Sequence, residues 1–406
     1  MYDAIIVGAR CAGASTAMLL ARKGHKVLLV DRSTFPSDIP HGHLIHRHGP
    51  KRLHDWGLLD RIVATGCPAI TEMSTDYGGI QLRGRELELD GVATAYGPRR
   101  VALDQVLVDA AIEAGAEFRP GFMVEEFVSS DGAITGVRGH GIHHGLAGEE
   151  RAWITIGADG RNSRLARTVN APKYEACDAL TGWYFSYWSG VTIRAIEIYE
   201  GDGSALFAFP TNDGLLAIFI GWERSKLEDV LANPETRFMK VVDAIPSLSE
   251  RVRAGHREER LRGVVDLPNF LRKPYGDGWA LVGDAGCHKD PYLALGMCDA
   301  LRDAELLANA IDRGLTGDQV MADALADYER LRNEATLPDY RQNLNMARFS
   351  PMPPEQRGLR AALLHDQAAT NQFYMAIEGM IPPESFFNPE NMQRLLSSAN
   401  SSAAAH

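Results

Sequence analysis

The sequence of 406 residues has few cysteines, no excess of positive charge and no long apolar run. Its 5 cysteines are far apart and form no C-x-x-C pair, which argues against a disulfide framework and against a zinc site. The formal net charge of −11 argues against a nucleic-acid partner, because phosphate binding requires a basic face. No apolar run is long enough to cross a membrane, and the first predicted strand leaves no room for a signal peptide. We therefore expect a cytoplasmic protein with reduced thiols and no membrane span.

What remains is the composition of an ordinary folded protein, with 45% apolar and 23% charged residues. The length is enough for two domains or for one large discontinuous domain. The predicted order begins with a strand, a glycine loop and a helix, and continues through mixed segments to about residue 175. A block of alternating aromatic strands follows, then a second strand-turn-helix unit near residue 280, then helices from about residue 316. This order indicates a domain assembled from separate segments of the chain.

The N-terminal segment carries the pattern of a dinucleotide-binding unit with one departure. Residues 4–7 form an apolar run that is typical of a buried parallel strand. Gly8 provides a tight turn and Gly13 allows close packing of helix on strand, but the middle glycine of the pattern is replaced by Arg10. A second predicted strand ends in Asp31, whose carboxylate can accept hydrogen bonds from ribose hydroxyls. The segment therefore predicts a βαβ nucleotide site.

Two arginines refine this prediction. Arg10 prevents the closest approach of backbone to a pyrophosphate, but it brings a guanidinium to the same neighbourhood, so we expect it beside the bound nucleotide. Arg32, directly after Asp31, has alternative roles. It can meet a 2′-phosphate, pack along the adenine, or remain a solvated charge at the end of the strand.

Two later motifs identify the kind of nucleotide. Residues 157–167 read GADGRNSRLAR, and residues 283–298 read GDAGCHKDPYLALGMC, each after a predicted strand. With the N-terminal loop, they resemble the three signatures of the flavoprotein monooxygenases of the para-hydroxybenzoate hydroxylase type, in order, from residue 1 to about residue 310. The resemblance implies FAD as cofactor and NAD(P)H as a transient co-substrate. It does not call for a separate NAD(P)H domain.

The implied fold is α/β, with a discontinuous Rossmann-like FAD-binding domain, a mainly antiparallel β-sheet substrate domain and C-terminal helices. We assign residues 1–75, 97–175 and 270–315 to the FAD-binding domain. Residues 76–96 and 176–269 form the substrate domain, and residues 316–406 form a helical region with a flexible tail. The glycine-rich stretch at 139–145, GHGIHHG, does not lead from a strand into a helix and predicts a hairpin turn.

The resemblance also implies roles for single residues. The implied FAD-binding residues are Gly8, Arg10, Ala12, Gly13, Asp31, Arg32, Arg100, Asp159, Gly160, Asp284, Pro291, Gly296 and Met297. Among them, Asp31 would hold the adenosine ribose and Asp284 a ribityl hydroxyl, and Arg100 would lie near the pyrophosphate. The helix that begins near Met297 would point its N–H groups at the pyrimidine end of the flavin. Asp159 would support the FAD and the approach of NAD(P)H.

The same loop departs from the family at two positions. Family members often have a glycine where this chain has Leu293 and an asparagine where it has Cys298. The details of flavin contact in this loop are therefore open.

Residues 181–224 contain aromatic side chains at alternating positions, which is the period of a strand. We expect a sheet with two aromatic faces, one packed on the FAD-binding domain and the other forming the wall of a pocket for a flat or apolar substrate. The predicted substrate contacts are Tyr184, Phe209 and Trp222.

Four histidines, His41, His43, His46 and His48, lie within one short segment. The spacing matches no standard zinc pattern, so we predict no metal. In the family the matching segment runs past the reactive ring of the flavin, and His43 is the candidate for catalytic acid–base. We expect His46 and His48 to begin the next helix and to face water.

Together these features predict an FAD-dependent monooxygenase. NAD(P)H would reduce the flavin, and a flavin C4a-hydroperoxide would hydroxylate a small electron-rich, aromatic substrate. One alternative is a geranylgeranyl-reductase-like flavoprotein that reduces isoprenoid double bonds. Another, of a different class, is a non-catalytic flavin- or ligand-binding protein. A flavin halogenase is disfavoured, because the W-x-W-x-I-P signature is absent. The identity of the substrate, the choice between NADH and NADPH, and the oligomeric state are not determined by the sequence.

Overall fold

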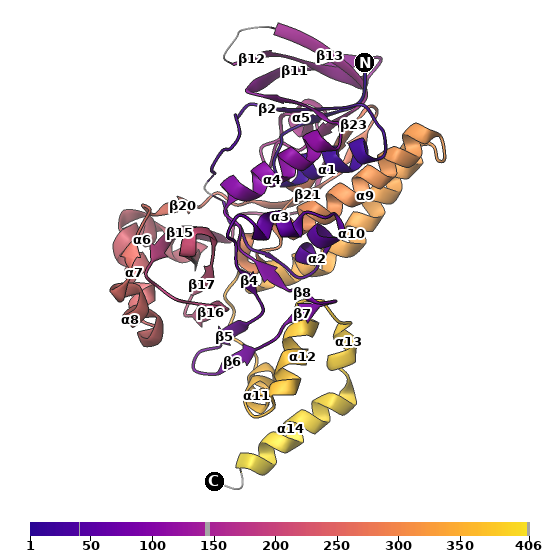
Figure 1. The fold of residues 1–406 in the computed structure, drawn as a ribbon. Helices are drawn as coiled ribbons and strands as arrows, with labels where there is room; N and C mark the ends of the chain where they lie inside the picture. The colour runs from indigo at the N-terminus through magenta and orange to yellow at the C-terminus, as the bar shows by residue number, and fades with distance from the viewer. Residues whose placement is uncertain (40, 143–146, 404–406) are drawn as a thin grey trace.

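The computed structural model describes residues 1–39, 41–142 and 147–403, with the backbone alone described for residues 398–403. Two large sheets of eight strands each organise the molecule (Figure 1). The hairpin formed by β11 and β12 lies at one end of the molecule, and helix α14 lies at the other (Figure 1).

The first sheet contains five parallel strands, of which the central ones are mostly buried and the edge strand is partly exposed. In spatial order they are β10 (Glu117–Pro120), β2 (Val27–Asp31), β1 (Tyr2–Val7), β13 (Ala147–Gly157) and β23 (Trp279–Leu281). β1 and β2 consist mainly of apolar residues because helices and strands cover both of their faces. β22 (Tyr275–Gly276) pairs antiparallel with β23, and the hairpin of β11 (Phe122–Ser130) and β12 (Ala133–Gly141) pairs with the first half of β13.

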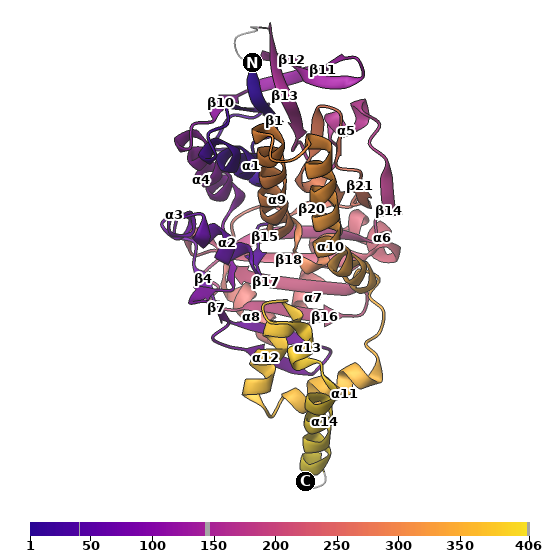
Figure 2. The same ribbon diagram turned by 90° about the vertical axis from the view of Figure 1, so that its right-hand side faces the viewer.

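Three long helices associate with this sheet and with one another: α1 (Cys11–Arg22), α4 (Arg100–Glu113) and α9 (Gly296–Thr316). The long helix α10 (Met321–Met346) lies side by side with α9 (Figure 2). Alanines and glycine on α1 are buried, so that the helix approaches the sheet closely. The short helix α5 (Arg164–Thr168) follows β13.

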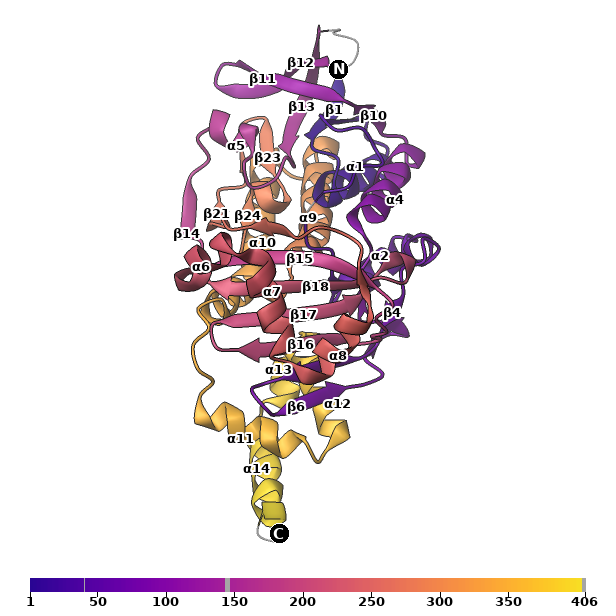
Figure 3. The ribbon, with the colours of Figure 1, turned by 90° about the vertical axis from the view of Figure 1, so that its left-hand side faces the viewer.

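The second sheet is antiparallel except where β5 pairs with β16. Its strands are β19 (His256–Arg257), β15 (Thr181–Ser189), β18 (Leu216–Glu223), β17 (Ser204–Pro210), β16 (Ile196–Gly201), β5 (Met73–Asp76) and β6 (Gln81–Gly84), with β20 (Arg262–Val264) beside β15. One face is covered by α6 (Leu227–Ala232), α7 (Pro234–Asp243) and α8 (Pro246–Ala254), which lie in front of the strands in Figure 3. The other face meets the histidine-rich segment and the C-terminal helices.

Short elements join the two sheets. The strands are β3 (Ile45–His46), β4 (Ala69–Ile70), β7 (Glu88–Leu89), β8 (Val92–Ala93), β9 (Ala95–Tyr96), β14 (Lys173–Cys177), β21 (Asn269–Arg272) and β24 (Cys287–His288). The helices are α2 (Gly49–Asp55) and α3 (Leu59–Val63), and the 3-10 turns are η1 (Asn212–Gly214), η2 (Arg224–Lys226), η3 (Gly283–Ala285) and η4 (Pro291–Leu293).

The C-terminal region is helical, as predicted. It contains α11 (Pro354–Leu363), α12 (Gln367–Ile377), α13 (Pro383–Phe386) and α14 (Pro389–Ala403). α14 continues to Ala403, so the flexible tail that we expected is helical over most of its length. The aromatic residues of α12 are buried, and the hydroxyl of Tyr374 donates a 3.2 Å hydrogen bond to the carbonyl of Leu82 on β6.

This architecture confirms the predicted fold class: a Rossmann-like parallel sheet, a mainly antiparallel second sheet and C-terminal helices. The strands of the first sheet come from residues 2–31, 117–157 and 275–281, and those of the second from residues 73–84 and 181–264. The limits of the domains stay a prediction. The expected turn at 139–145 begins within β12, which ends at Gly141, and its residues 143–145 lie outside the described residues.

Within the described residues, no helix is both long and apolar enough to cross a membrane. The same part of the chain contains no group of three or more His, Cys, Asp or Glu side chains arranged to hold a metal ion.

Candidate active site

The glycine loop before α1 has the geometry of an anion site. Gly8 has φ +107°, and a Cβ atom there would lie 2.4 Å from the carbonyl oxygen of Ala158. A Cβ atom at Gly13 would lie 1.8 Å from the carbonyl oxygen of Gly8, so neither position accepts a larger residue. Arg10 occupies the N-cap position without a side-chain cap, and the first turn of α1 contains no acidic residue. The first N–H groups of the helix are therefore available to a phosphate.

Asp31 closes this loop from the end of β2. Its Oδ2 atom accepts a 2.8 Å hydrogen bond from the N–H of Ala9, and its Oδ1 atom accepts one of 2.7 Å from the N–H of Ser33. Each carboxylate oxygen keeps a further lone pair, which can accept a hydrogen bond from a ribose hydroxyl. Arg32 is exposed and makes no ion pair with any described residue.

Asp104 is a completely buried carboxylate that sequence reasoning missed. It accepts a 2.7 Å bond from Nη1 of Arg10 and bonds of 3.2 and 2.9 Å from Nε and Nη2 of Arg100. The two arginines predicted beside the pyrophosphate are thus joined through one carboxylate. The i,i+4 spacing of Arg100 and Asp104 is the signal that could have revealed the pair.

Two carboxylates near the loop lack a full set of partners. Asp284 is partly exposed and makes no hydrogen bond within the described part of the chain. Asp159 accepts a 2.7 Å bond from the N–H of Arg164 through Oδ2, but its Oδ1 atom is buried without a partner. A buried unpaired oxygen is costly unless a donor arrives. Beside it, Gly160 has φ +79° and open space around its Cα.

His41 lies near the same charged groups. Its side chain is exposed, yet its pKa is lowered to about 4, mainly because surrounding protein atoms desolvate it and secondarily because the Arg100 guanidinium is near. Asp284 and Arg10 also act on its charge. The open helix terminus and the incompletely paired carboxylates of Asp159 and Asp284 fit the flavin dinucleotide that the resemblance implies.

The loop before α9 contains the next group of predicted residues. Asp290 stabilises it: its Oδ1 atom accepts a 3.1 Å bond from the N–H of Tyr292, its Oδ2 atom accepts one of 2.6 Å from the hydroxyl of Thr181, and burial raises its pKa to about 6. α9 begins at Gly296 without a side-chain cap, and the space around Gly296 is open. Pro291 and Met297, the other predicted residues of this loop, are partly exposed.

The second sheet presents a stack of phenyl rings toward this loop. The rings of Phe185 and Phe219 are 4.7 Å apart and nearly parallel, and those of Phe219 and Phe209 are 5.5 Å apart at 8°. Tyr292, from the loop, contacts the neighbouring rings of Trp183 and Phe207 edge-on. These rings and the loop before α9 therefore share one apolar interior.

His43 lies inside this aromatic cluster and is completely buried. Its Nδ1 atom is 3.0 Å from the carbonyl oxygen of Gly97, which can only accept, so Nδ1 carries the hydrogen. Its Nε2 atom then accepts from the hydroxyl of Tyr187 at 3.0 Å. Burial lowers the pKa of His43 to about 3, so the ring is neutral at physiological pH.

Tyr187 connects His43 to the protein surface. The guanidinium of Arg99 lies 4.5 Å from the centre of the Tyr187 ring and pairs with Glu259 at 2.5 Å. A hollow of about 370 Å³ lies beside Arg99, lined by Asp38, Thr65, Arg99, Val101, Ala102, Asn212 and Asp213. The period of the strand places Tyr187 on the same face as Phe185, but the sequence alone did not relate Tyr187 to His43.

The three predicted substrate contacts do not lie together. Phe209 belongs to the face that contains His43. Tyr184 and Trp222 contact each other at 6.2 Å on the opposite face, which α6, α7 and α8 cover. Side chains of one strand alternate between faces, so an odd–even choice of positions decided this difference.

The prediction that His46 faces water is wrong. His46 is 5% exposed, and its ring lies between Glu378 and the carbonyl of Leu293. His48 is exposed at the start of α2, as expected. The partner of His46 lies more than 300 residues away in the sequence, and no local pattern could have indicated it.

Comparisons with known proteins agree with this geometry. A family model described as "FAD binding domain" matches residues 1–336. A 1H-pyrrole-2-carbonyl-[peptidyl-carrier protein] brominase of Pseudoalteromonas luteoviolacea is 24% identical over 342 residues, which cover 78% of this chain and 79% of that protein. A digeranylgeranylglycerophospholipid reductase of Methanospirillum hungatei is 28% identical over 338 residues, 79% of each chain.

Solved structures show the same fold. A flavoprotein/dehydrogenase from Cytophaga hutchinsonii superposes with a TM-score of 0.81 at 18% identity, covering 99% of this chain and all of the other. PqsL from Pseudomonas aeruginosa, described as a probable FAD-dependent monooxygenase, superposes with a TM-score of 0.70 at 20% identity, covering 92% of this chain and 98% of that one.

Proposed function

Since the chain belongs to the FAD-binding-domain family and is an FAD-dependent oxidoreductase, we propose that it is a monooxygenase that hydroxylates a small, electron-rich aromatic substrate. NAD(P)H is the proposed electron donor. We propose further that the enzyme works in the cytoplasm, where its cysteines, all free in the structure, stay reduced.

The glycine loop before α1 and the charged groups around it would hold FAD. The N-terminus of α1, with Gly8, Ala12 and Gly13, takes the pyrophosphate, and Arg10 and Arg100 add positive charge beside it. Asp31 takes the adenosine ribose and Asp284 the ribityl chain. When bound, FAD supplies the redox chemistry, accepting electrons from NAD(P)H and passing them to O₂.

The single observation that carries the proposal is the buried phenyl stack opposite the loop that begins α9. Phe209 and its neighbours offer a flat aromatic substrate a dry surface at the same interior that the flavin-facing loop borders. Exclusion of water matters here, because a reactive oxygen species that is exposed to water decays before it can hydroxylate the substrate. We retain Phe209 as the substrate contact and place Tyr184 and Trp222 in the packing of the other face.

In this proposal His43 acts through Tyr187. The neutral imidazole accepts the hydrogen of the Tyr187 hydroxyl and so fixes the orientation of that group. A phenol held in this way can direct its oxygen lone pairs toward a substrate hydroxyl. The variant His43→Gln is expected to bind FAD normally and to turn over slowly.

A second candidate is the reduction of isoprenoid double bonds. It is favoured by the apolar character of the same face, which suits a prenyl chain, and by the 28% identity with the digeranylgeranylglycerophospholipid reductase. The experiment that separates the candidates is a screen of phenols, aryl acids and prenyl lipids for stimulation of NAD(P)H oxidation, with the mass of each product measured.

Three mass changes are informative. Gain of one oxygen atom with O₂ consumed supports the monooxygenase, and gain of two hydrogens under anaerobic conditions supports the reductase. Gain of bromine or chlorine when halide is added would support neither and would favour a halogenase. If the purified protein binds FAD but none of the compounds in the screen stimulates NAD(P)H oxidation, a non-catalytic binding protein is favoured.

A further inference from the structure

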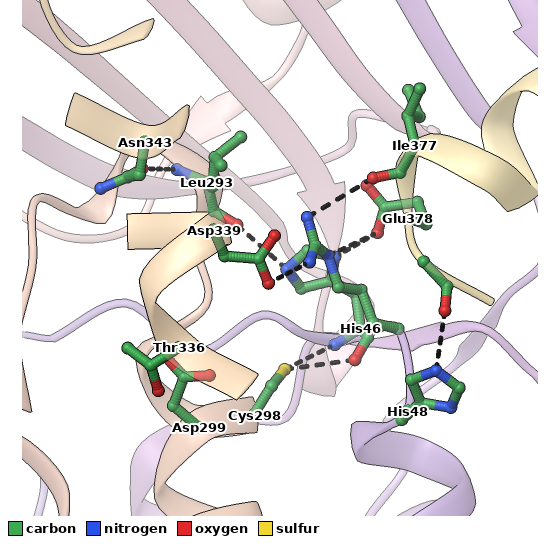
Figure 4. A network of polar contacts seen from close by, with 12 residues as sticks. His46, His48, Leu293, Cys298, Asp299, Thr336, Asp339, Asn343, Ile377 and Glu378 are labelled. Atoms are coloured by element: carbon green, nitrogen blue, oxygen red, sulfur yellow. Dashed lines mark hydrogen bonds and ion pairs between the residues drawn. The ribbon is translucent and has the colours of Figure 1, made fainter. Parts of the chain in front are cut away.

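Residues 46–48 of the histidine-rich segment contact residues 377–379 at the end of α12 (Figure 4). Nδ1 of His46 is 2.5 Å from Oε2 of Glu378, and Nε2 of His48 is 2.9 Å from the carbonyl oxygen of Gly379. Arg47, between the two histidines, pairs with Asp339 on α10 at 2.7 Å. Basic side chains at the C-terminal end of a helix are stabilised by the negative end of the helix dipole.

The ring of His46 has an acceptor on each side. Nδ1 faces the carboxylate of Glu378, and Nε2 is 3.1 Å from the carbonyl oxygen of Leu293. Carbonyl and carboxylate oxygens accept but do not donate, so both bonds form together only when both ring nitrogens carry hydrogen. The two bonds together link the end of α12 to the loop before α9.

The charges around Glu378 favour its ionised form. Burial alone would raise the pKa of Glu378, but the charge and hydrogen bond of His46, with the Arg47 guanidinium 3.9 Å away, lower it. Glu378 is therefore an ionised carboxylate. The other ionisable groups near the pair are His48, Asp339 and Cys298 together with its neighbour Asp299.

The backbone of His46 holds the other end of the same loop. Its carbonyl oxygen accepts from Sγ of Cys298 at 3.2 Å, and its N–H lies 3.4 Å from the same sulfur. Burial raises the pKa of the Cys298 thiol to about 11, so the thiol keeps its hydrogen and can donate it. His46 thus contacts both Leu293 and Cys298, the two positions at which this loop departs from the family pattern.

α10 supports the loop from a second side. The side chain of Asn343 accepts from the N–H of Leu293 at 2.9 Å and donates to the carbonyl of Asp290 at 2.7 Å. With His46, these bonds fix both the N–H and the carbonyl of Leu293. The residue that follows, Ala294, has a left-handed backbone, φ 52°, and an alanine holds that conformation only when its neighbours are fixed.

We propose that His46 is a positioning residue for the loop at residues 291–298, and that Glu378 at the end of α12 holds it in that role. The inference rests on the proposed function only in that this loop faces the flavin. Glu378 lies beyond residue 336, where the match to the family model ends, so this chain supplies the support from its own C-terminal region.

The expected consequence concerns the reduced cofactor. By the resemblance, the N-terminus of α9, which begins at Gly296 without a side-chain cap, would direct its N–H groups toward the pyrimidine end of a bound flavin, where negative charge develops on reduction. If the loop loosens, these donors are less well placed. FAD should then bind more weakly, and its midpoint potential should become more negative.

The test compares His46→Phe, Glu378→Gln and, as control, His48→Gln. His48 contacts the same C-terminal segment but not the loop. We expect His46→Phe to weaken FAD binding about tenfold, the factor that corresponds to about 1.4 kcal/mol. It should also shift the midpoint potential downward and change the visible circular dichroism of the bound flavin. Glu378→Gln should change all three in the same direction and by less, and His48→Gln should change none.

Each outcome decides between the ideas. A folded His46→Phe protein with unchanged potential and dichroism would overturn the positioning role while leaving the proposed function intact. If that variant does not fold, Glu378→Gln decides, and an unchanged potential in it has the same meaning. Wild-type protein that cannot bind FAD would remove the proposed function and the inference with it.

Discussion

His43 and Asp104 are both completely buried, and the structure accommodates them in opposite ways. His43 is a neutral imidazole among aromatic rings. It donates a hydrogen bond to the carbonyl of Gly97 and accepts one from the hydroxyl of Tyr187. The carboxylate of Asp104 instead has two cationic partners, because the guanidiniums of Arg10 and Arg100 both bond to it. A buried ionisable group needs one of these two solutions.

The neutral state of His43 makes the protein sensitive to acid. Its pKa is about 3 in the folded protein and near 6.5 when unfolded, so below pH 6.5 only the unfolded chain takes up the proton. As pH falls from 7 to 5, we expect His43 to lower the free energy of unfolding by about 2 kcal/mol. The measurement is urea unfolding of wild type and His43→Gln at both pH values. His41 titrates in both proteins and cancels. A difference between the two proteins that does not change with pH would contradict the burial of a neutral His43.

Asp104→Asn should damage both stability and the cofactor site. It leaves the buried guanidinium of Arg100 and the partly exposed guanidinium of Arg10 without a carboxylate, which costs about 3 kcal/mol. FAD binding should weaken as well, because both arginines lose their position. The control is Asp55→Asn, which breaks an exposed pair with Lys51 at the same i,i+4 spacing and should cost less than about 0.5 kcal/mol. Equal losses in the two variants would show that Asp104 is not a buried anchor.

At the scale of the element, the strand β17 and its neighbour β18 separate two environments by alternation alone. Phe209 and Trp222 are 3% and 4% exposed, so their burial is almost equal. They differ in the face on which they lie: Phe209 is near His43, and Trp222 is under α6, α7 and α8. Burial therefore cannot distinguish a substrate contact from a packing residue, whereas the face can.

Phe209→Leu and Trp222→Leu test this distinction. Each removes a buried ring, so we expect a similar loss of stability, about 1 to 3 kcal/mol. The KM for an identified substrate should rise several-fold in Phe209→Leu and stay within experimental error in Trp222→Leu. Thermal unfolding and steady-state kinetics provide the two measurements. A raised KM in Trp222→Leu alone would place the substrate on the other face.

The sequence predicted those elements whose cause is local. The apolar runs of β1 and β2, the glycines at 8 and 13, and the alternation in β15 depend on residues close together in the chain. Alternation defines two faces of a sheet but not which of them meets a substrate, so the sequence could not separate Phe209 from Tyr184 and Trp222. The environment of His46 depends on Glu378, and only the folded chain brings these residues together.

At the scale of the whole molecule, the C-terminal helices complete the aromatic interior. Phe373 and Tyr374 on α12 and Phe386 on α13 are at most 1% exposed and belong to the same apolar cluster as Phe209 and Phe219. Glu378, at the end of α12, also contacts the histidine-rich segment. Helices α11 to α14, at the lower end of the view in Figure 2, thus contribute to the core, and the residue after α12 contacts the histidine-rich segment.

Graded truncation tests this role. A chain that stops after residue 346 loses these buried rings and Glu378, and should expose apolar surface, bind a hydrophobic dye and retain little FAD. A chain that stops after residue 388 loses α14 but keeps α12 and the pair of His46 with Glu378. We expect it to stay folded, with lower thermal stability, and to keep the visible spectrum of bound flavin. Full FAD binding by the shorter chain would show that the C-terminal helices are dispensable.

The strand order of the first sheet has a consequence for synthesis of the chain. β1 leaves the ribosome first, but the partner on one of its sides is β13 at residues 147–157, and β13 in turn waits for β23 at residues 279–281. During that interval the edge of an apolar strand is unpaired, which is a template for association between nascent chains. A chaperone that covers residues 2–7 during this interval should therefore raise the yield of correctly assembled protein.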